Sequence, residues 1–494
     1  MQQVERTMRS ENLDRREAIV LAQRAWEAMS LRARISVIAR LRQSMAVGAR
    51  ELAETVPTNL PGLLHRTVAD TLGSEIVPLI AACQFVVREA GRILKTRRLG
   101  RRGRPLWLTG VQTEVERAAL GVVLVVGAGN YPLLLAGVQT IQALTAGNAV
   151  LWKPAPGTAA AAVALRALLL ECGLNPDLLT LLSPEVESVS DAIAAGVDHV
   201  VLTGSAQTGK AVMRQLAETL TPATMELSGC DAVFVLPGAE LEHMVRAIGF
   251  GLRFNGSFTC MAPRRVFLVG LREDEAAQIE ARLAAMAREL APVPLPAKTE
   301  ELLRGLIADA RGQGAEIALD GLGDCGDSRE AGATLIYRAT PAMRAMRGDI
   351  FAPVLSLMRT SDLGEALAAN GACPYALTAA IFGPEAEARR LAGRLRVGNV
   401  LINDIVIPTV DPRVAFGGRG RSGFGVTRGA EGLLAMTTPR TVQVQHGRIP
   451  FAYEATGDEH VELFAGLAKV LHCDGIGNRW DGLKRLVRAA RRLK

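Results

Sequence analysis

A thiol, a carboxylate and an amide are the side chains of this sequence that are best placed to do chemistry. Cys260 follows a glycine-containing turn, Glu226 ends a short extended run 34 residues earlier, and Asn130 follows small residues at the end of an apolar run. A thiolate is a nucleophile, a carboxylate can take up a proton, and an amide N–H can stabilise negative charge. Structural alternatives stay open, because Asn130 can cap a helix and Glu226 can pair with an arginine.

A second set of residues could bind a ligand that carries phosphate. Lys153 ends an expected strand, while Gly204 and Ser205 end another strand and open a helix. The exposed N–H groups at a helix start favour phosphate. On the pattern alone, Ser205 could equally be an ordinary helix N-cap, and Lys153 could be a solvated surface charge.

The other cysteines and the histidines are poorer candidates. Cys83 and Cys172 lie in apolar helical runs, which favours buried, inert thiols. Cys325 lies among acidic residues that would raise the pKa of its thiol. No Cys-x-x-Cys pair occurs among the seven cysteines and the six histidines form no cluster, so we assign no metal. Such cysteine usage favours a reducing, cytoplasmic setting.

Alternating strands and helices should position the candidate residues. Between Gly121 and Glu226, continuous apolar strands are separated by helices, a pattern that predicts a parallel sheet covered on both faces. The expected strands are 121–127, 149–153, 178–182 and 200–203, and the expected helices are 133–145, 158–172, 188–195 and 206–220. Ligands bind beyond the carboxyl ends of such strands, so the candidate residues should meet at one edge of a doubly wound sheet.

The rest of the chain suggests a second alternating region and an N-terminal helical one. A length of 494 residues favours about three domains. The further expected strands are 232–236, 265–269 and 354–358, the plainest early helices are 41–52 and 76–94, and 292–296 is expected to be a surface loop.

Composition excludes several classes of protein. Hydrophobic residues make up 49% and charged residues 22%, which is the balance of a folded globular protein. A net charge of +7 is a weak field for 494 residues, and few aromatic side chains lie among the arginines, so nucleic-acid binding is not expected. The longest apolar stretch, 118–138, is interrupted by Asn130 and Pro132, and the start of the chain lacks the apolar core of a signal peptide.

Seven motifs in order make this chain resemble the aldehyde dehydrogenase superfamily from about residue 22 to about residue 442. They are Gly127-Ala-Gly-Asn-Tyr-Pro132, Ala146-Gly-Asn-Ala-Val-Leu-Trp-Lys-Pro154, Leu202-Thr-Gly-Ser205, Glu226-Leu-Ser-Gly229, Asn255 to Cys260, Asp349-Ile-Phe-Ala-Pro-Val354 and Phe416-Gly-Gly-Arg-Gly-Arg-Ser-Gly-Phe-Gly425. The resemblance implies an α/β, aldehyde-dehydrogenase-like fold. It would have a doubly wound cofactor domain, an α/β catalytic domain and a small oligomerisation element.

The resemblance also implies roles for the catalytic residues. Cys260 stands where the family has the thiolate that attacks the aldehyde carbon. Asn130 and the backbone N–H of Cys260 match the donors to the resulting oxyanion. Glu226 matches the general base that activates water to hydrolyse a cysteine thioester. The implied reaction is the oxidation of an aldehyde to a carboxylic acid through a thiohemiacetal and a thioester.

The implied cofactor is NAD or NADP. Lys153 would hold the adenosine ribose, Gly204 and Ser205 the pyrophosphate, the Leu227 backbone the nicotinamide amide, and Asp349 the nicotinamide ribose. Phe351 would pack beside the nicotinamide ring.

Several positions depart from the family pattern. Pro156 replaces a Glu that holds the ribose 2′-OH, which leaves the choice between NAD and NADP open. Gly129 replaces an aromatic residue, Phe258 replaces Gln, and Ser228 and Cys230 depart from Glu-Leu-Gly-Gly-Lys. These changes reshape the pocket without removing a group that the reaction needs. The alternatives are a coenzyme-A-acylating member, which Glu226 argues against, and a catalytically silent binding protein.

Domains and partners follow by the same analogy. We expect an NAD(P)-binding domain (1–97 and 119–228), a catalytic domain (229–430), an oligomerisation element (98–118 and 431–450) and a C-terminal extension (451–494). A small aldehyde substrate and a cytoplasmic homodimer or homotetramer without an integral membrane segment are expected.

The C-terminal extension ends in an amphipathic helix. Its expected apolar face carries Leu483, Leu486, Val487 and Ala490. Its other positions include Lys484, Arg485, Arg488, Arg491 and Arg492. Such a helix could bind an anionic membrane surface, but its short apolar face favours a solvated helix or a subunit contact.

Overall fold

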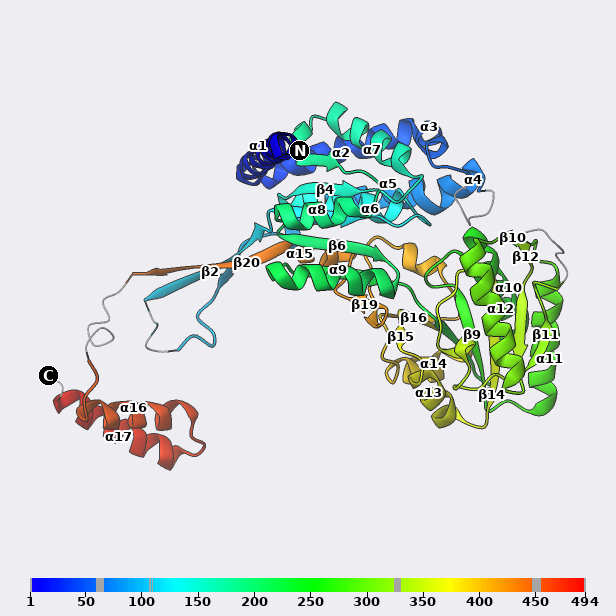
Figure 1. Ribbon diagram of the computed structural model, residues 1–494. Helices are drawn as coiled ribbons and strands as arrows, with labels where there is room; N and C mark the ends of the chain where they lie inside the picture. Colours follow the sequence, from blue (N-terminus) through cyan, green and yellow to red (C-terminus); the bar gives the residue numbers. More distant parts are fainter. Residues whose placement is uncertain are drawn as a thin grey trace. The chain divides into compact units, whose positions relative to one another are not determined.

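The computed structural model describes residues 2–58, 66–105, 108, 110–323, 330–446 and 455–492. The chain divides into two compact units (Figure 1). Unit 1 comprises Met1–Lys95 and Arg117–Arg440, and unit 2 comprises Thr96–Glu116 and Thr441–Lys494.

A six-stranded sheet forms the centre of the first half of unit 1. Its spatial order is β19-β7-β6-β3-β4-β5, and all neighbours are parallel except β19, which runs antiparallel to β7. The strands are β3 (Val122–Val126), β4 (Ala149–Lys153), β5 (Leu179–Leu181), β6 (His199–Gly204), β7 (Ala223–Leu227) and β19 (Gly423–Phe424). Each of the four expected strands is confirmed to within one residue at either end.

Helices cover this sheet on both faces. They are α6 (Leu134–Ala146), α7 (Ala159–Glu171), α8 (Glu187–Ala195) and α9 (Ala206–Thr219), as expected to within one residue. Right-handed crossovers run outward from β3 to β5 and then return to β6, so α6 and α7 cover one face and α8 and α9 the other. The doubly wound parallel sheet is therefore confirmed.

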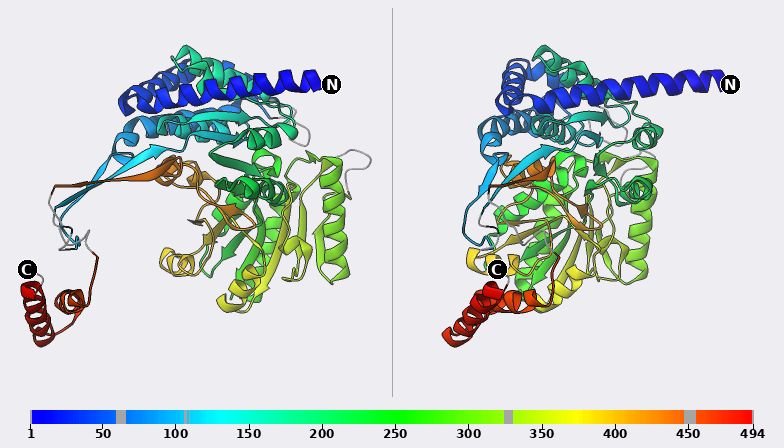
Figure 2. Two further views of the ribbon diagram at one scale, coloured as in Figure 1. Left: turned by 60° about the vertical axis from the view of Figure 1, so that its left-hand side comes forward. Right: turned by 90° about the vertical axis from the view of Figure 1, so that its left-hand side faces the viewer.

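N-terminal helices add a further layer beside α6 (Figure 2). They are α1 (Gln2–Ala28), α2 (Leu31–Val47), α3 (Ala49–Glu54), α4 (Val68–Thr71) and α5 (Val77–Ile93), with a π-helical turn at Leu72–Ile76. The expected helices 41–52 and 76–94 are confirmed, except that Gly48 ends α2 and α3 begins directly after it. The stretch Val68–Ile93 is apolar and long enough to cross a membrane, but half of its most apolar window is buried inside the protein.

A seven-stranded sheet forms the second half of unit 1. Its order is β11-β13-β14-β9-β8-β16-β17, with β11 antiparallel and the rest parallel. The strands are β8 (Asp231–Val235), β9 (Pro263–Val269), β11 (Glu316–Leu319), β13 (Thr334–Tyr337), β14 (Val354–Thr360), β16 (Thr378–Phe382) and β17 (Asn399–Ile402). The expected strands near 232, 265 and 354 are confirmed.

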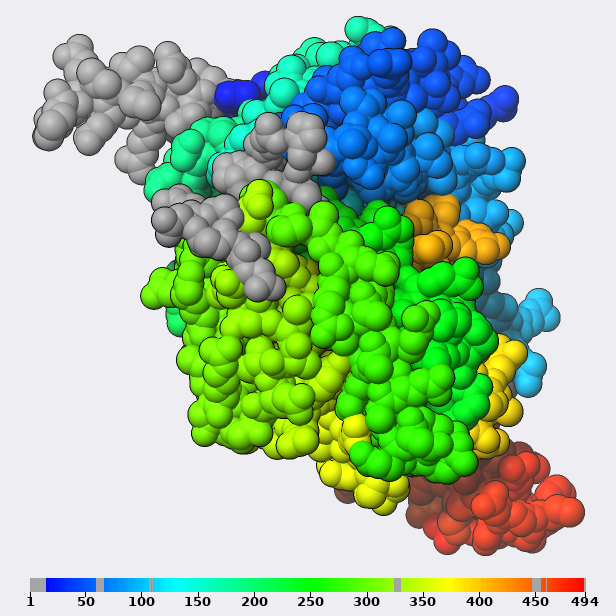
Figure 3. All heavy atoms as spheres, turned by 90° about the vertical axis from the view of Figure 1, so that its right-hand side faces the viewer, coloured from blue at the N-terminus to red at the C-terminus, as the bar shows by residue number. Residues whose placement is uncertain are grey.

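The helices of this half lie around the second sheet, and α11 and α12 form an outer surface (Figure 3). The helices are α10 (Leu241–Arg253), α11 (Glu273–Arg288), α12 (Ala297–Gly312), α13 (Leu363–Gly371), α14 (Glu385–Ala392) and α15 (Gly429–Ala435), of which α15 contacts α5 and α6 instead. The expected surface loop at 292–296 is wrong, because Val293 and Leu295 are buried and β10 (Val293–Pro294) pairs with β12 (Glu330–Ala331).

Unit 2 contains a helical hairpin and most of a small sheet, whose two longer strands have one end each in unit 1. The sheet has the order β1-β2-β20, formed by β1 (Arg97–Leu99), β2 (Val111–Ala119) and β20 (Thr437–Gln445). The hairpin consists of α16 (Glu459–His472) and α17 (Ile476–Arg492), which pack against each other.

Candidate active site

The carboxyl edge of the first sheet collects most of the candidate residues. In the order β5-β4-β3-β6-β7 the chain runs outward from β3 and then crosses back to β6, so β3 and β6 flank the switch point where open α/β sheets bind ligands. Asn130 follows β3, Lys153 ends β4, Gly204 ends β6, and Glu226 lies near the end of β7. The strand pattern predicted that these residues would meet at one edge of the sheet, and the structure places them there.

Cys260 lies on a left-handed turn of the second half of unit 1. The three successive residues Asn255, Gly256 and Ser257 have φ values of 50°, 61° and 66°. Left-handed backbone is costly for residues other than glycine and persists only where its surroundings hold it. Cys260 follows this turn and is partly buried. The strand β9 begins three residues later, at Pro263.

Arg264 holds this turn from inside the protein. Its guanidinium donates to Ser257 Oγ at 2.7 Å, to the Ser257 carbonyl at 2.7 Å and to the Ala352 carbonyl at 2.7 Å. The side chain is buried. One arginine thus ties the turn before Cys260 to the loop that carries Asp349 and Phe351, and the sequence offered no signal for it.

Asn130 is hydrogen-bonded to the segment that carries Cys260. Its Nδ2 donates to the Phe258 carbonyl at 3.0 Å, and Asn255 Nδ2 donates to the Asn130 carbonyl at 3.0 Å. The neighbouring hydroxyls of Tyr131 and Thr259 lie 2.7 Å apart. The structure therefore brings Asn130 within two residues of Cys260 and engages one of the two N–H groups of its amide.

A buried ion pair that sequence reasoning missed supports the Asn130 loop. Arg66 pairs with Glu75, donates to the Asn130 carbonyl at 3.0 Å and to Asn255 Oδ1 at 2.8 Å. Glu75 Oε2 accepts from the Leu133 and Leu134 N–H groups at 2.7 and 3.0 Å, at the start of α6. Burial raises the pKa of Glu75, and Arg66 and these N–H groups oppose that rise.

Glu226 is buried with one free oxygen. Its Oε2 accepts from Thr427 Oγ1 at 2.8 Å, while no described residue bonds to its Oε1. Gly423 of β19 pairs with Glu226 in the sheet. Burial raises the pKa of Glu226, and Arg428, Thr427 and Gln139 lower it by smaller amounts. The carboxyl therefore holds a proton more readily than an exposed glutamate.

The Cys260 thiol shares this electrostatic environment. Burial raises its pKa most, and the charges of Glu226, Asp231 and Asp349 raise it further, whereas Arg428 lowers it. These interactions place Cys260 and Glu226 in one electrostatic cluster. Burial therefore favours the protonated form of both the Cys260 thiol and the Glu226 carboxyl.

The residues expected to bind the cofactor differ in whether other protein groups already bond to them. Lys153 is buried and makes no hydrogen bond or ion pair with any described residue. Burial lowers the pKa of Lys153, and the charge of Glu185 opposes this. Ser205 caps α9 by accepting from Thr208 N at 3.1 Å. A Cβ on Gly204 would meet no atom closer than 3.6 Å, and the Leu227 N–H donates to the Ser422 carbonyl at 3.2 Å.

Asp349 and Phe351 lie beside the Cys260 turn. The Phe351 ring stacks on Phe258, with centroids 5.8 Å apart and planes 8° from parallel. The departure at Phe258 is thus explained by a packing partner. Burial raises the pKa of Asp349, which Ser228 and Arg264 oppose, so the departing residue Ser228 also lies at this site.

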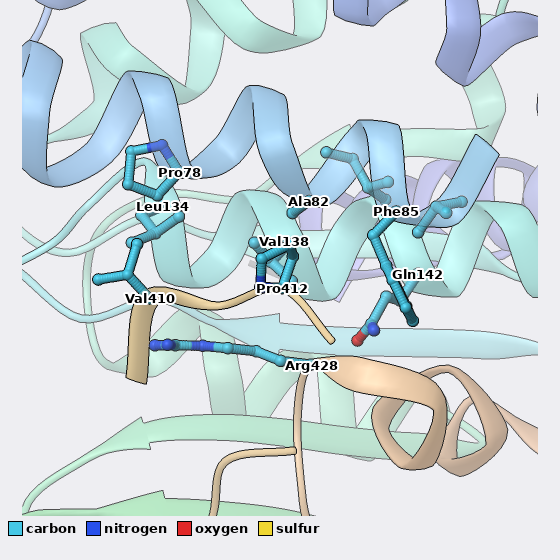
Figure 4. Close-up of a pocket in the computed structure, with 11 residues that line it drawn as sticks. Pro78, Ala82, Phe85, Leu134, Val138, Gln142, Val410, Pro412 and Arg428 are labelled. Atoms are coloured by element: carbon cyan, nitrogen blue, oxygen red, sulfur yellow. The ribbon is translucent and has the colours of Figure 1, made fainter. Parts of the chain in front are cut away.

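A narrow cavity lies between α5, α6 and the segment 410–428 (Figure 4). Its interior volume is only about 20 Å³, which is room for little more than one water molecule. Its lining is Pro78, Ala82, Phe85, Val86, Leu134, Val138, Ile141, Gln142, Val410, Pro412 and Arg428. Arg428 lies along one wall, donates to the Thr409 carbonyl at 2.9 Å and covers the Phe416 ring at 4.8 Å. The cavity is apolar apart from Arg428 and Gln142.

The remaining cysteines are placed as follows. Cys83 and Cys172 are buried, as expected. Cys230, which lies directly after Gly229, is buried beside Cys373, whose thiol raises the pKa of Cys230. Cys325 lies outside the described residues. Within the described part of the chain no three His, Cys, Asp or Glu side chains are grouped as metal ligands.

Comparison with known proteins identifies the family. Residues 3–442 match the aldehyde dehydrogenase family. The chain belongs to this family. It is 28% identical over 457 residues to 4,4′-diapolycopene aldehyde oxidase of a Methylomonas species, a match that covers 89% of this chain and 83% of that protein.

Solved structures of aldehyde dehydrogenases share the fold. An NADP-dependent glyceraldehyde-3-phosphate dehydrogenase of Bacillus halodurans, complexed with NADP, is 25% identical with a TM-score of 0.79, covering 89% of this chain and 92% of that one. A Mycobacterium tuberculosis aldehyde dehydrogenase complexed with NAD⁺ is 24% identical with a TM-score of 0.76 and the same two coverages. This aldehyde dehydrogenase is accordingly an enzyme that depends on NAD or NADP.

The residues of this chain fit such a dinucleotide. Lys153 is a buried cation that no described residue pairs with. Gly204 has no side chain to obstruct a ligand, and the first turn of α9 is mostly exposed to solvent. A helix start of this kind accepts phosphate.

Proposed function

We propose that this aldehyde dehydrogenase oxidises an aldehyde to a carboxylic acid through a thioester on Cys260. The observation that carries the proposal is the hydrogen bond from Asn130 Nδ2 to the Phe258 carbonyl, which joins the two halves of unit 1 beside the thiol. Glu226 supports it, because its charge acts on the Cys260 thiol and its Oε1 is free of partners among the described residues.

In the first step the Cys260 thiol releases its proton to water and the thiolate attacks the aldehyde carbon. A C–S bond forms while the carbonyl π electrons move to oxygen. The second N–H of the Asn130 amide and the backbone N–H of Cys260 stabilise this oxyanion. Removing one such donor typically costs about 3–4 kcal/mol of barrier. Arg428 also favours the thiolate, because it lowers the pKa of Cys260.

The residues that would hold NAD(P) are Lys153, Gly204, Ser205, Leu227, Asp349 and Phe351. NAD(P)⁺ supplies the hydride acceptor that turns the adduct into a thioester. Asp349 would accept hydrogen bonds from ribose hydroxyls, and Phe351 is already held in place by Phe258. Pro156 leaves no carboxylate at that position to repel a 2′-phosphate, so both NAD and NADP would be accepted.

Glu226, ionised at this stage, acts in the last step. Its buried Oε1 accepts a proton from a water molecule, the water oxygen attacks the thioester carbon, and the C–S bond breaks to return the thiolate. The raised pKa of Glu226 suits this work, because a general base is most effective when its pKa lies near the working pH.

The preferred aldehyde and cofactor are determined by turnover assays. A panel of aliphatic and aromatic aldehydes, each tested with NAD and with NADP, provides this measurement.

The decisive experiment combines this panel with coenzyme A and two cysteine variants. Aldehyde-dependent NAD(P)H formation should fall by about a thousandfold or more in Cys260→Ala. The matched change Cys172→Ala, at a buried thiol far from the site in sequence, should retain it. Formation of acyl-coenzyme A in place of the acid would identify an acylating enzyme. A chain that forms neither product nor a Cys260 adduct would be the silent binding protein.

We further propose the domain roles and assembly that the family resemblance implies. Residues 1–97 and 119–228 would bind the cofactor, residues 229–430 would carry the thiol, and residues 98–118 and 431–450 would join a cytoplasmic homodimer or homotetramer.

A further inference from the structure

The α16–α17 hairpin is held together along one side by close backbone contact. A Cβ on Gly466 would lie 2.8 Å from Leu486 N, and a Cβ on Gly482 would lie 2.6 Å from Lys469 Cβ. Lys469 pairs with Asp481 at 2.7 Å across this contact. The two helices therefore approach as closely as glycine permits, and this contact determines which face of α17 is covered.

The opposite face of α17 carries an apolar stripe that is exposed. Ile476, Trp480, Leu483 and Val487 are exposed by 88%, 58%, 40% and 42%. Spacings of four, three and four residues place them on one side of the helix. The stripe spans about 16 Å at 1.5 Å per residue. It is longer than the sequence-based face around Leu483, because Ile476 and Trp480 extend it by two turns.

Basic side chains flank this stripe. α17 carries six basic residues against the single acidic Asp481, and only Arg485 among them is in an ion pair with a described residue. Lys484 lies with its Nζ 5.9 Å from the centre of the Trp480 ring. The basic residues are Arg479, Lys484, Arg485, Arg488, Arg491 and Arg492. At 100° per residue, Lys484 and Arg491 border the stripe on one side and Arg479 on the other.

We propose that the α16–α17 hairpin is a docking surface for anionic phospholipid membranes, with α17 lying in the plane of the interface. An apolar stripe bordered by lysine and arginine is the pattern of helices that bind at the headgroup level. Trp480 would sit at the boundary between headgroups and acyl chains, and the long basic side chains would reach the phosphates.

The positive charge of α17 favours a membrane over a second copy of the chain as the binding partner of this stripe. Two α17 stripes packed together would bring two strongly basic helices into contact, and like charges oppose such a contact. An anionic bilayer supplies both the apolar layer and the negative charge that the helix lacks. The short apolar face expected from the sequence favoured a subunit contact, and the longer exposed stripe reverses that preference.

The test is co-sedimentation of the full chain with phospholipid vesicles. We expect binding to vesicles of phosphatidylcholine that contain one quarter phosphatidylglycerol, loss of binding at high salt, and no binding to phosphatidylcholine alone. Trp480 emission should shift to the blue only with the anionic vesicles. No binding to anionic vesicles, or equal binding to both kinds, would overturn the proposal.

Variants separate the two contributions. The triple change Lys484→Gln, Arg488→Gln and Arg491→Gln should weaken binding by about a hundredfold, and Trp480→Ala with Leu483→Ala should weaken it at every salt concentration. The same loss of charge at the exposed positions Arg214, Arg288 and Lys298, and the exposed pair Val47→Ala with Val186→Ala, are the matched controls and should bind normally.

Light scattering of the same variants tests the competing occupant. If the hairpin variants lose self-association while the native chain ignores vesicles, the face is a subunit contact and the membrane proposal is wrong. Turnover of a water-soluble aldehyde should stay unchanged in all hairpin variants, which distinguishes this surface from the active site.

Discussion

Titration at the site is decided by a few buried charges around one thiol. Cys260, Glu226 and Asp231 are each pushed toward their protonated forms by burial. Arg428 acts in the opposite direction on Cys260 and Glu226. The ionisation of each of these groups is therefore sensitive to the charges of its neighbours.

Glu226→Gln should separate the two half-reactions. The variant keeps an oxygen for Thr427 but cannot take a proton from water, so the thioester should accumulate and steady-state turnover should fall by about a hundred- to ten-thousandfold. Mass spectrometry of denatured protein after mixing with aldehyde and cofactor would detect the acyl group on Cys260. Acid release at the native rate by this variant would contradict the assignment.

Asp231 links the site to stability through pH. Burial raises the pKa of Asp231 from 3.8 to about 7, and its Oδ2 has no partner among the described residues. The folded state thus binds this proton more tightly than the unfolded state. The resulting stability is complete below pH about 4 and is lost as the pH rises through about 7.

Asp231→Asn removes this pH dependence. The free energy of unfolding of this variant, relative to the native chain, should increase by up to about 4 kcal/mol from pH 4 to pH 7. Above pH 7 the difference should stay constant. Urea unfolding across this range provides the measurement. The variant should also let Cys260 react with iodoacetamide at lower pH, because a negative charge near the thiol is gone. A constant stability difference would show that Asp231 titrates normally.

At the scale of elements, the site lies where three segments distant in sequence are clamped together. Arg66 precedes α4, Asn130 follows β3 and Asn255 precedes β9, and all three share hydrogen bonds. Arg264 then connects the Cys260 turn to the loop before β14. The positions of the candidate residues are therefore set by these hydrogen bonds between distant segments more than by any one strand.

Arg66→Met should lower turnover through position alone. Loss of its bonds to Asn130 and Asn255 would shift the oxyanion donor, and an error of about 1 Å can cost about a hundredfold. The unpaired Glu75 should cost a further ~3–5 kcal/mol of stability. The double variant Arg66→Met with Glu75→Gln should recover stability but not kcat, with Arg88→Met, exposed on α5, as control. Recovery of kcat in the double variant would rule out a positioning role.

Two glycines make a matched pair for the packing of elements. Gly423 has φ of 99°, and a Cβ there would lie 1.9 Å from the Met225 carbonyl, so Gly423→Ala should displace β19 from β7 and destabilise by more than about 2 kcal/mol. Gly91 in α5 has no atom within 4 Å of its Cβ position, so Gly91→Ala should stabilise by about 0.5–1 kcal/mol. Chemical denaturation measures both, and equal effects would contradict this packing.

At the scale of the whole molecule, the small sheet of unit 2 lacks a core of its own. β20 is an edge strand of that sheet, and residues 438–445 are exposed, including Val442 and Val444 at 39% and 45%. An exposed apolar edge strand is a template for pairing with another chain. The family analogy and this edge favour assembly through β20.

Val442→Lys with Val444→Lys should therefore dissociate the oligomer. Charges on neighbouring edge positions of the same face would repel across the contact. Light scattering at micromolar concentration compares the variant with Val47→Lys and Val163→Lys, which are exposed apolar positions of unit 1. A native chain that is already monomeric would contradict the proposed assembly.

The amino-acid sequence alone determined the alternating strands and helices from β3 to α9 and the motif residues at the edge of that sheet. Periodicity of 2 and of 3.6 residues is local, and it locates β3, β4 and α6 to within one residue, so the edge that collects Asn130, Lys153 and Glu226 follows from strand order rules. Local patterns failed only where burial came from elsewhere, as at Val293 and Leu295.

Only the tertiary structure decided how those residues are held. Arg66 reaches Asn255 across 189 positions, and Phe258 finds Phe351 as its stacking partner. No local pattern marks such pairs, because a hydrogen bond or ring contact depends on distance in space, and chain folding sets that distance independently of sequence separation. For the same reason, the exposure of Trp480 could be determined only from the packing of α16 against α17.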